Sequence, residues 1–237
     1  VNYATSIIID YQNDLNGLNK LPYTINTELR MLYNPELKGA YSSVPGVMGM
    51  ILLLISTMMT SISIVKEKEL GTMEILLVSP MKPFLVIISK VIPYFVISLI
   101  NVATILFLSV HILGMPIQGS TILLIAITIL YIFCALSLGI LISTITDSQL
   151  AAMLISLLGL MLPVVMLSGY VFPVANMPII LQVLSNIVPA KWYIIMVKSV
   201  MIKGLGINGI WRESLILFGM TIFFIAISLK RFKIRLT

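Results

Sequence analysis

Long runs of apolar residues dominate the chain and predict helices that cross a membrane. A helix needs about 20 mainly apolar residues to span the hydrocarbon core of a bilayer. Five runs are of roughly this length: residues 44–65, 91–113, 121–145, 149–168 and 214–229. Pro163 is expected to kink the fourth helix, because its ring removes one backbone hydrogen bond. The pattern therefore predicts an all-α polytopic membrane protein, with residues 44–237 as its transmembrane domain.

Residues 169–212 are expected to be re-entrant or interfacial. Three prolines interrupt the stretch: Pro173, Pro178 and Pro189. They leave only the ten residues 179–188 between them, and runs of that length are more typical of re-entrant segments than of spans. Trp192 and Tyr193 are typical of side chains at the level of the lipid headgroups. An alternative is a sixth span over 179–203, which would place Lys191 near its middle.

Residues 1–43 are more polar and predict a separate segment outside the membrane. Turn signals occur at "NDLNG" and "YNPE", and the nearby "SIIIDY" and "ELRMLY" are typical of short strands. The segment is too short to bury much of a core by itself, so we expect part of an α+β extracytoplasmic domain. The chain begins at Val1 without the features of a signal peptide. We therefore expect a longer protein whose N-terminal part is missing here.

Composition agrees with a membrane protein and bears on its partners. Hydrophobic residues make up 59% of the chain and charged residues 10%, whereas a soluble domain carries about 25% charged residues. The net charge of +6 does not indicate nucleic-acid binding, because the Lys and Arg residues cluster at the ends of apolar runs. There they orient helices and meet anionic lipid headgroups. Membrane lipids, and no nucleic acid, are the expected partners of these charges.

The basic residues also predict the orientation of the chain. The C-terminal "KRFKIRLT" carries four of them directly after the last span, which places the C-terminus in the cytoplasm by the positive-inside rule. With five spans, residues 66–90 and 146–148 are then cytoplasmic. This arrangement gives eight basic residues inside against four in the outer loop 169–212.

Catalytic chemistry finds little support in the residues. Cys134 is the only cysteine and lies deep in an apolar run, so the chain can form no disulfide or cysteine metal site by itself. His111, the only histidine, lies at the end of a span. A membrane enzyme would need ionisable groups inside the membrane, and no span carries Asp, Glu, Arg or His in its middle. We expect a chain that is not an enzyme and that binds no metal or cofactor.

A secondary transporter or channel that works without an ATPase is the alternative function. Proton or sodium coupling usually needs a carboxylate inside the membrane, and none is visible in the spans. A missing N-terminal helix could supply one, so this alternative stays open. The chain has no G-x-x-x-x-G-K-[ST] motif, so it has no P-loop of its own to hold ATP phosphates.

A charged stretch between the first two spans, "KEKELGTMEILLVSP" at residues 66–80, predicts a short cytoplasmic helix. Three apolar residues recur at helical spacing and form a stripe: Leu70, Met73 and Leu77. Glu67 and Glu74, seven residues apart, share another face with Gly71, and Pro80 ends the helix. Such a helix is suited to docking against another protein. An ordinary solvated loop that sets membrane topology would carry similar charges.

This stretch resembles the cytoplasmic signature of ABC-2 type permeases, the membrane subunits of a class of bacterial ATP-binding-cassette exporters. The matching residues are Lys66, Glu67, Glu69, Gly71, Thr72, Glu74, Leu76, Ser79 and Pro80. Two further stretches are similar to the same family. One is "YNPELKGAYSSVPGVMGMIL", at the entry to a span. The other is residues 167–204, which resemble the family's re-entrant helices, with prolines 173, 178 and 189 and Tyr193 in familiar positions.

The resemblance implies a six-span permease of the bacterial plasma membrane whose first helix lies outside this chain. It implies a second permease subunit, in a homodimer or heterodimer, and a cytoplasmic ATP-binding cassette subunit that holds the ATP. The residues implied in coupling to that ATPase are Lys66, Glu67, Glu69, Leu70, Gly71, Thr72, Met73, Glu74, Ser79 and Pro80.

Seven of these ten residues have a stated role at the expected ATPase interface. The glutamates would pair with basic groups of the ATPase, and Leu70 and Met73 would form a buried anchor. Gly71 would allow close approach of the ATPase, and Thr72 would satisfy a backbone group.

The three re-entrant prolines and Tyr193 would take part in gating. The Ile-, Leu- and Met-rich spans suit an amphipathic or apolar exported substrate, such as a drug or a lipid-like molecule.

Overall fold

The computed structural model describes residues 6, 7, 10, 11, 14, 33, 38–72 and 83–234. The chain divides into two compact units, Val1–Lys38 and Gly39–Thr237. In the first unit, Ser6, Ile7, Asp10 and Tyr11 have helical backbone. The expectation that "SIIIDY" forms a strand is therefore wrong at its four described positions. A helix completes its hydrogen bonds within itself, whereas a strand needs a neighbour, so three isoleucines alone do not fix a strand. The second predicted strand, "ELRMLY", lies outside the described residues apart from Tyr33.

All the regular secondary structure among the described residues of the second unit is helical, which confirms the all-α prediction. Five of its helices are long and apolar enough to cross a membrane: α2 (Ala40–Glu69), α4 (Pro83–His111), α5 (Thr121–Ile145), α6 (Gln149–Leu167) and α9 (Trp211–Ile234). Two shorter α-helices lie between α6 and α9, namely α7 (Ile179–Ser185) and α8 (Pro189–Met201). Two 3₁₀ turns, η1 (Val174–Asn176) and η2 (Ile207–Gly209), precede α7 and α9.

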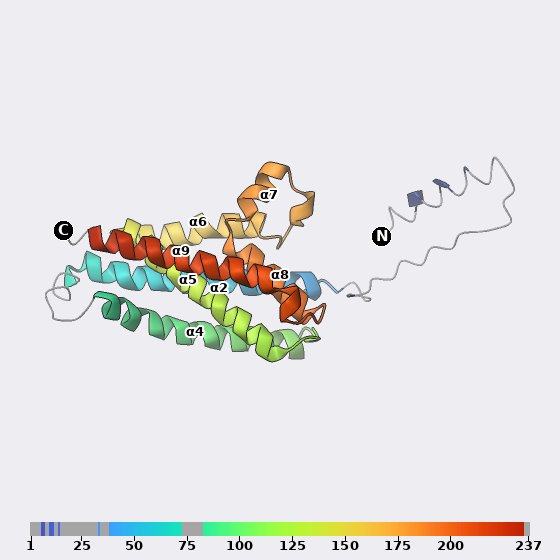
Figure 1. The fold of residues 1–237 in the computed structure, drawn as a ribbon, viewed down its shortest axis with the longest axis horizontal. Helices are drawn as coiled ribbons and strands as arrows, with labels where there is room; N and C mark the ends of the chain where they lie inside the picture. Colours follow the sequence, from blue (N-terminus) through green and yellow to red (C-terminus); the bar gives the residue numbers. More distant parts are fainter. Residues whose placement is uncertain are drawn as a thin grey trace. The chain divides into compact units, whose positions relative to one another are not determined.

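The long helices run beside one another as a bundle, with α2 and α5 at its centre (Figure 1). α5 packs against α2, α4, α6, α8 and α9. It is apolar on all sides, as expected for a helix surrounded by other helices or lipid. In contrast, α4 and α6 are buried over only a small share of their length, so most of their surface is left for lipid or for another protein.

Small residues allow α2 and α5 to approach closely. A Cβ atom at Gly139 of α5 would lie 2.7 Å from the backbone oxygen of Thr57 in α2. The Thr57 hydroxyl donates to the Ala135 carbonyl of α5 at 2.9 Å. Serine pairs add hydrogen bonds from α2 to the helices beside it: Ser56 with Ser98 of α4 at 2.7 Å, and Ser61 with Ser156 of α6 at 3.0 Å. Such contacts stabilise the association of helices within the bilayer, because the hydrophobic effect does not drive helices together in lipid.

The region between α6 and α9 does not form a straight sixth helix. α7 and α8 meet at an 85° bend, as in a broken span or a re-entrant loop. The break falls at Pro189, which occupies the first turn of α8 and cannot donate the hydrogen bond that would continue α7. α7 lies beside one end of α6 (Figure 1).

Candidate functional site

The last turn of α2 carries the charged residues that the sequence singles out. α2 continues through Lys66, Glu67, Lys68 and Glu69, and Gly71 then adopts a positive φ of 71°. This left-handed conformation suits glycine and ends the helix. The predicted separate helix over 66–80 is therefore wrong in its described half. Lys66–Glu69 belong to the spanning helix α2 itself. Because α2 ends at Gly71, the acidic face that was expected to continue past Gly71 along one helix is interrupted there. Met73, Glu74, Leu76, Leu77, Ser79 and Pro80 lie outside the described residues.

Glu67 joins α2 to α4. Its carboxylate accepts a hydrogen bond from the Lys90 ammonium at 2.6 Å and forms an ion pair with it. The Thr72 hydroxyl donates to the same carboxylate and also to the Glu67 backbone carbonyl, at 3.1 Å. Thr72 therefore satisfies a backbone group, as expected, but one in its own chain. This arrangement fixes the carboxylate between the end of one span and the first turns of the next.

Lys68 and Glu69 hold the two neighbouring helix ends. The Lys68 ammonium donates to the carbonyl of Ser143 and, at 3.4 Å, to that of Thr146, at the C-terminal end of α5. The Glu69 carboxylate accepts from the backbone N–H of Gln149, the first residue of α6, at 2.9 Å. A cation at a helix C-terminus and an anion at a helix N-terminus are both favourable, because they complement the helix dipole and unsatisfied backbone groups.

We call Glu67, Lys68 and Glu69 the charged turn. Each of its residues contacts a different helix, so one turn of α2 links the ends of α4, α5 and α6. The sequence did not indicate the partners of the charged turn: Lys90, Ser143, Thr146 and Gln149. Charge alone could have suggested only Lys90.

Two side chains at this end of α2 point to solvent or to another protein. Lys66 is exposed, and Leu70 is 62% exposed although it is a large apolar residue. Around Gly71 there is open space where a Cβ atom would lie, so no neighbouring group of the chain requires a glycine there. The left-handed backbone conformation of Gly71 accounts for the glycine instead. Glu67 and Glu69, which were expected to form an acidic docking face, thus accept hydrogen bonds from groups of the same chain. In contrast, the exposed Leu70 can contact a partner.

The re-entrant region is fixed to the bundle through two stacked tyrosines. Tyr193 of α8 and Tyr131 of α5 are both fully buried, with ring centroids 4.0 Å apart and planes within 2°. The Tyr131 hydroxyl donates to the Gly49 carbonyl of α2 at 2.7 Å, and the Tyr193 hydroxyl shares a hydrogen bond with Thr128 at 3.0 Å. Tyr193 therefore does not contact the lipid headgroups as an exposed anchor, because its ring is buried inside the bundle. Neighbouring helix positions point about 100° apart, so Tyr193 faces the core while Trp192 is half-buried.

The prolines of this region begin its short helices. Pro173 precedes η1, Pro178 precedes α7, and Pro189 occupies the first turn of α8. Next to Pro189, the Lys191 ammonium donates to the Ser185 hydroxyl at 2.9 Å and to the Asn186 side chain at 2.6 Å. Lys191 thereby fastens the end of α7 to α8.

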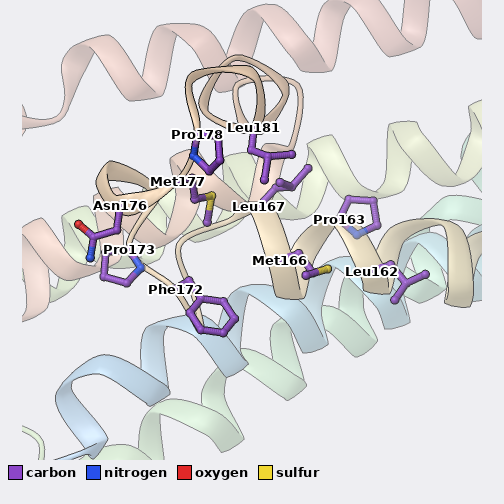
Figure 2. A pocket seen from close by; sticks show the side chains of 10 residues that line it. All are labelled: Leu162, Pro163, Met166, Leu167, Phe172, Pro173, Asn176, Met177, Pro178 and Leu181. Carbon is purple, nitrogen blue, oxygen red and sulfur yellow. The ribbon is translucent and has the colours of Figure 1, made fainter.

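A pocket of about 500 Å³ lies between α6 and the η1–α7 segment. Figure 2 shows the ten side chains that line it, which come from the second half of α6 and from residues 172–181. The lining is apolar apart from Asn176: Leu162, Pro163, Met166, Leu167, Phe172, Pro173, Met177, Pro178 and Leu181 complete it. Pro173 and Pro178, which were expected to take part in gating, thus meet Pro163 of α6 around one cavity.

Comparison with known proteins identifies the family. The sequence model of the ABC-2 family transporter protein matches residues 2–230. The chain belongs to the ABC-2 transporter family. It is therefore a multi-pass membrane domain of that family. The charged turn lies within residues 66–80, the stretch that resembles the family's cytoplasmic signature.

Among the described residues, no group of three or more His, Cys, Asp or Glu side chains could hold a metal ion.

Several bacterial relatives are permeases by name. The chain is 32% identical to the "Probable multidrug ABC transporter permease YbhS" of Escherichia coli K12 over 180 residues, which are 76% of this chain and 48% of the relative. It is also 32% identical to the permease YbhR over 214 residues, or 90% of this chain and 57% of the relative. The match to "ABC transporter G family member 20" of Dictyostelium discoideum is 25% over 237 residues, 96% of this chain and 32% of that protein. The chain thus spans about half the length of these bacterial relatives. No solved structure matches it.

Proposed function

We propose that this chain is the membrane-spanning part of an ATP-driven exporter permease, coupled to a separate cytoplasmic ATP-binding cassette subunit. The observation that carries the proposal is the charged turn, found in a member of the ABC-2 family at the position of the family's cytoplasmic signature. Three consecutive side chains bind three different helices there. A displacement of this turn would therefore reach α4, α5 and α6 together with α2.

The ATPase is proposed to act on the end of α2 through exposed contacts. Leu70, at 62% exposure, is the apolar anchor that would be buried by the partner, and Lys66 is the exposed charge beside it. A few anchor residues that become fully buried contribute most of the binding energy of such interfaces. Glu67 and Glu69 act mainly within the chain: they transmit movement of the turn to α4 and α6. ATP binds to the partner subunit in this scheme.

The proposed substrate is an apolar or amphipathic molecule, drug-like or lipid-like. The pocket between α6 and the η1–α7 segment supports this substrate class, because its lining is apolar with a single amide at Asn176 (Figure 2). A pocket of 300–1,000 Å³ with few polar groups is typical of small-molecule sites. Relatives are named multidrug permeases. A second permease subunit, placement in the bacterial plasma membrane and a cytoplasmic C-terminus complete the proposal.

Co-purification of the ATPase tests the proposal. In the full-length permease, Leu70→Asp should abolish retention of the cognate ATPase subunit and ATP-dependent transport into inverted vesicles. Ile207→Asp is the matched control, because Ile207 is 65% exposed and lies in η2, outside the charged turn. Both variants should fold normally, since each alters an exposed side chain. Retention and transport by Leu70→Asp at the level of the control would contradict docking at this turn. Transport that continues without ATP would instead favour the secondary transporter.

A further inference from the structure

The pocket between α6 and the η1–α7 segment has two walls that are held in place differently. One wall is the second half of the long helix α6, and the other is formed by residues 172–181 (Figure 2). α7 packs mainly against α6 and η1. Three of its large aliphatic side chains point away from the rest of the chain: Ile179, Ile180 and Val183 are 78%, 74% and 61% exposed. Apolar contacts within the chain therefore do little to fix the position of α7.

α8, which follows α7 after the 85° bend, is in contrast packed into the bundle. It contacts α2, α5 and α9, and most of its residues are buried. The stack of Tyr193 on Tyr131 and the hydrogen bond between Tyr193 and Thr128 join it to α5. α8 is therefore a fixed support to which α7 can be attached.

Two consecutive residues of α8 hold the end of α7. The Lys191 ammonium donates to the Ser185 hydroxyl at 2.9 Å and to the side-chain oxygen of Asn186 at 2.6 Å. The indole N–H of Trp192 donates to the backbone carbonyl of Asn186 at 3.0 Å. Lys191 is only 9% exposed, and no carboxylate among the described residues forms an ion pair with it. A buried cation needs oxygen atoms that accept from it, and here both acceptors belong to the C-terminal end of α7.

Further hydrogen bonds continue from Lys191 to the wall of the pocket. The Ser185 hydroxyl, which accepts from Lys191, donates to the Gln182 carbonyl at 2.6 Å. The side-chain amide of Gln182 donates to the Met177 carbonyl at 2.8 Å, and Met177 lines the pocket. Hydrogen bonds in such a chain strengthen one another where water is excluded. The chain of bonds thus connects α8, through α7, to the wall that faces α6.

We propose that Lys191 is a positioning residue for this pocket. By holding α7 on α8, its ammonium sets the separation of the two walls and, through that separation, the affinity of the pocket for an apolar molecule. Lys191 itself does not line the pocket. A methionine in its place would keep an unbranched side chain but could donate no hydrogen bond, so two oxygens of α7 would lose their donor. The role of the pocket in substrate binding rests on the proposed function, whereas the attachment of α7 to α8 does not.

The position of α7 is measured in the full-length permease by double electron–electron resonance. Spin labels are attached through Leu158→Cys in α6 and Ile180→Cys in α7, in a cysteine-free background. Both side chains are exposed, and neither lines the pocket. The labelled chain is diluted with unlabelled chain, so that only distances within one chain are read.

The wild type should give one narrow distribution of distances. Lys191→Met should at least double its width, and Lys191→Arg should restore it, because arginine keeps the charge and the donors. Lys203→Met is the matched control: it removes an exposed ammonium just beyond α8 and should leave the distribution unchanged.

The consequence for binding is measured with the lipophilic dye Hoechst 33342, in inverted vesicles that hold the permease and its cognate ATPase. Lys191→Met should raise the KM for the dye roughly tenfold, as expected for the loss of a hydrogen bond from a charged group. The maximal rate and the retention of the ATPase should change less than twofold, whereas misfolding would lower both. Lys191→Arg should behave like the wild type.

The outcomes separate this inference from the proposed function. A wild-type distance distribution in Lys191→Met would overturn the inference. So would an unchanged KM in that variant while Leu181→Trp, which fills the pocket, raises the KM. If the wild type exports no dye, or Leu181→Trp has no effect, the proposed substrate site fails. The distance measurement then decides by itself whether Lys191 positions α7.

Discussion

The ion pair between Glu67 and Lys90 gives the sharpest prediction for the charged turn. Its oxygen and nitrogen are 2.6 Å apart, and the Lys90 and Glu67 side chains are 35% and 21% exposed. Exposed ion pairs contribute about 0.2–1 kcal/mol, whereas breaking a fully buried pair costs about 3–5 kcal/mol. A half-buried pair should lie between these limits. We therefore expect a coupling energy of about 1–2 kcal/mol between Glu67 and Lys90.

A double-mutant cycle isolates this energy. The variants are Glu67→Gln, Lys90→Gln and the double variant. Gln at position 67 keeps an oxygen that can accept from Thr72, so the cycle reports mainly the lost charge pair. One kcal/mol corresponds to a shift in Tm of about 2–4 °C for a chain of this size. Each single variant should thus lower the apparent Tm in detergent by about 2–8 °C, and the double variant should be little worse than either.

Salt and a charge swap provide the controls. At about 1 M salt the screening length falls to roughly 3 Å, so the difference between the wild type and Glu67→Gln should shrink. Glu67→Lys combined with Lys90→Glu should recover part of the stability lost by Glu67→Lys alone. If the losses of the two single variants simply add in the double variant, the pair contributes nothing, and the link from α2 to α4 must rest on other contacts.

Three further outcomes are expected. Glu69→Gln should destabilise the protein by about 0.5–1 kcal/mol, because it removes an anion from the N-terminus of α6; an unchanged Tm in low salt would show that this contact is not formed. Gly139→Ala should cost about 1–3 kcal/mol, because its Cβ would meet a backbone oxygen of α2 at 2.7 Å. Gly219→Ala, with open space around it inside α9, is the control and should leave the Tm unchanged or raise it slightly, because alanine favours a helix. In a cysteine-free background, cysteines at Asn176 and Asn208 should both react with an impermeant thiol reagent from the same side of the membrane; reaction from opposite sides would show that α7 and α8 together form a sixth span.

The charged stretch shows where inference from the sequence reached its limit. Its residues were identified as important from their pattern, but the pattern treated 66–80 as one helix with a common acidic face. The positive φ of Gly71 ends α2 after one charged turn. Periodicity could not show this, because a glycine within a helix and a glycine that ends one look the same in a short run. The partners of Lys68 are backbone carbonyls about 75 residues away, and carbonyls leave no signal in a sequence.

Tyr193 illustrates the same limit in the re-entrant region. An aromatic pair after a short apolar run is typical of a membrane interface, and this reasoning treated Trp192 and Tyr193 alike. The structure separates them, since Tyr193 is fully buried against Tyr131. Which side of a short helix faces inward depends on the elements that pack over it, and those elements lie far away in the chain.

The apolar pattern of the sequence predicted the class of the protein and the number of long helices, but not all of their limits: α4 begins eight residues before the start expected for it. α5 begins and ends at the residues expected for it, and α6 differs by a single residue. These features follow from the local requirement that about 20 consecutive residues be apolar and satisfy their own hydrogen bonds in lipid. The packing of the folded chain determines which helix each charged side chain binds and which of the two aromatic residues, Trp192 or Tyr193, is fully buried. Those features depend on contacts between residues distant in the chain. In a membrane helix the apolar residues are spread nearly evenly around the helix, so their pattern carries little information about which helices pack against it.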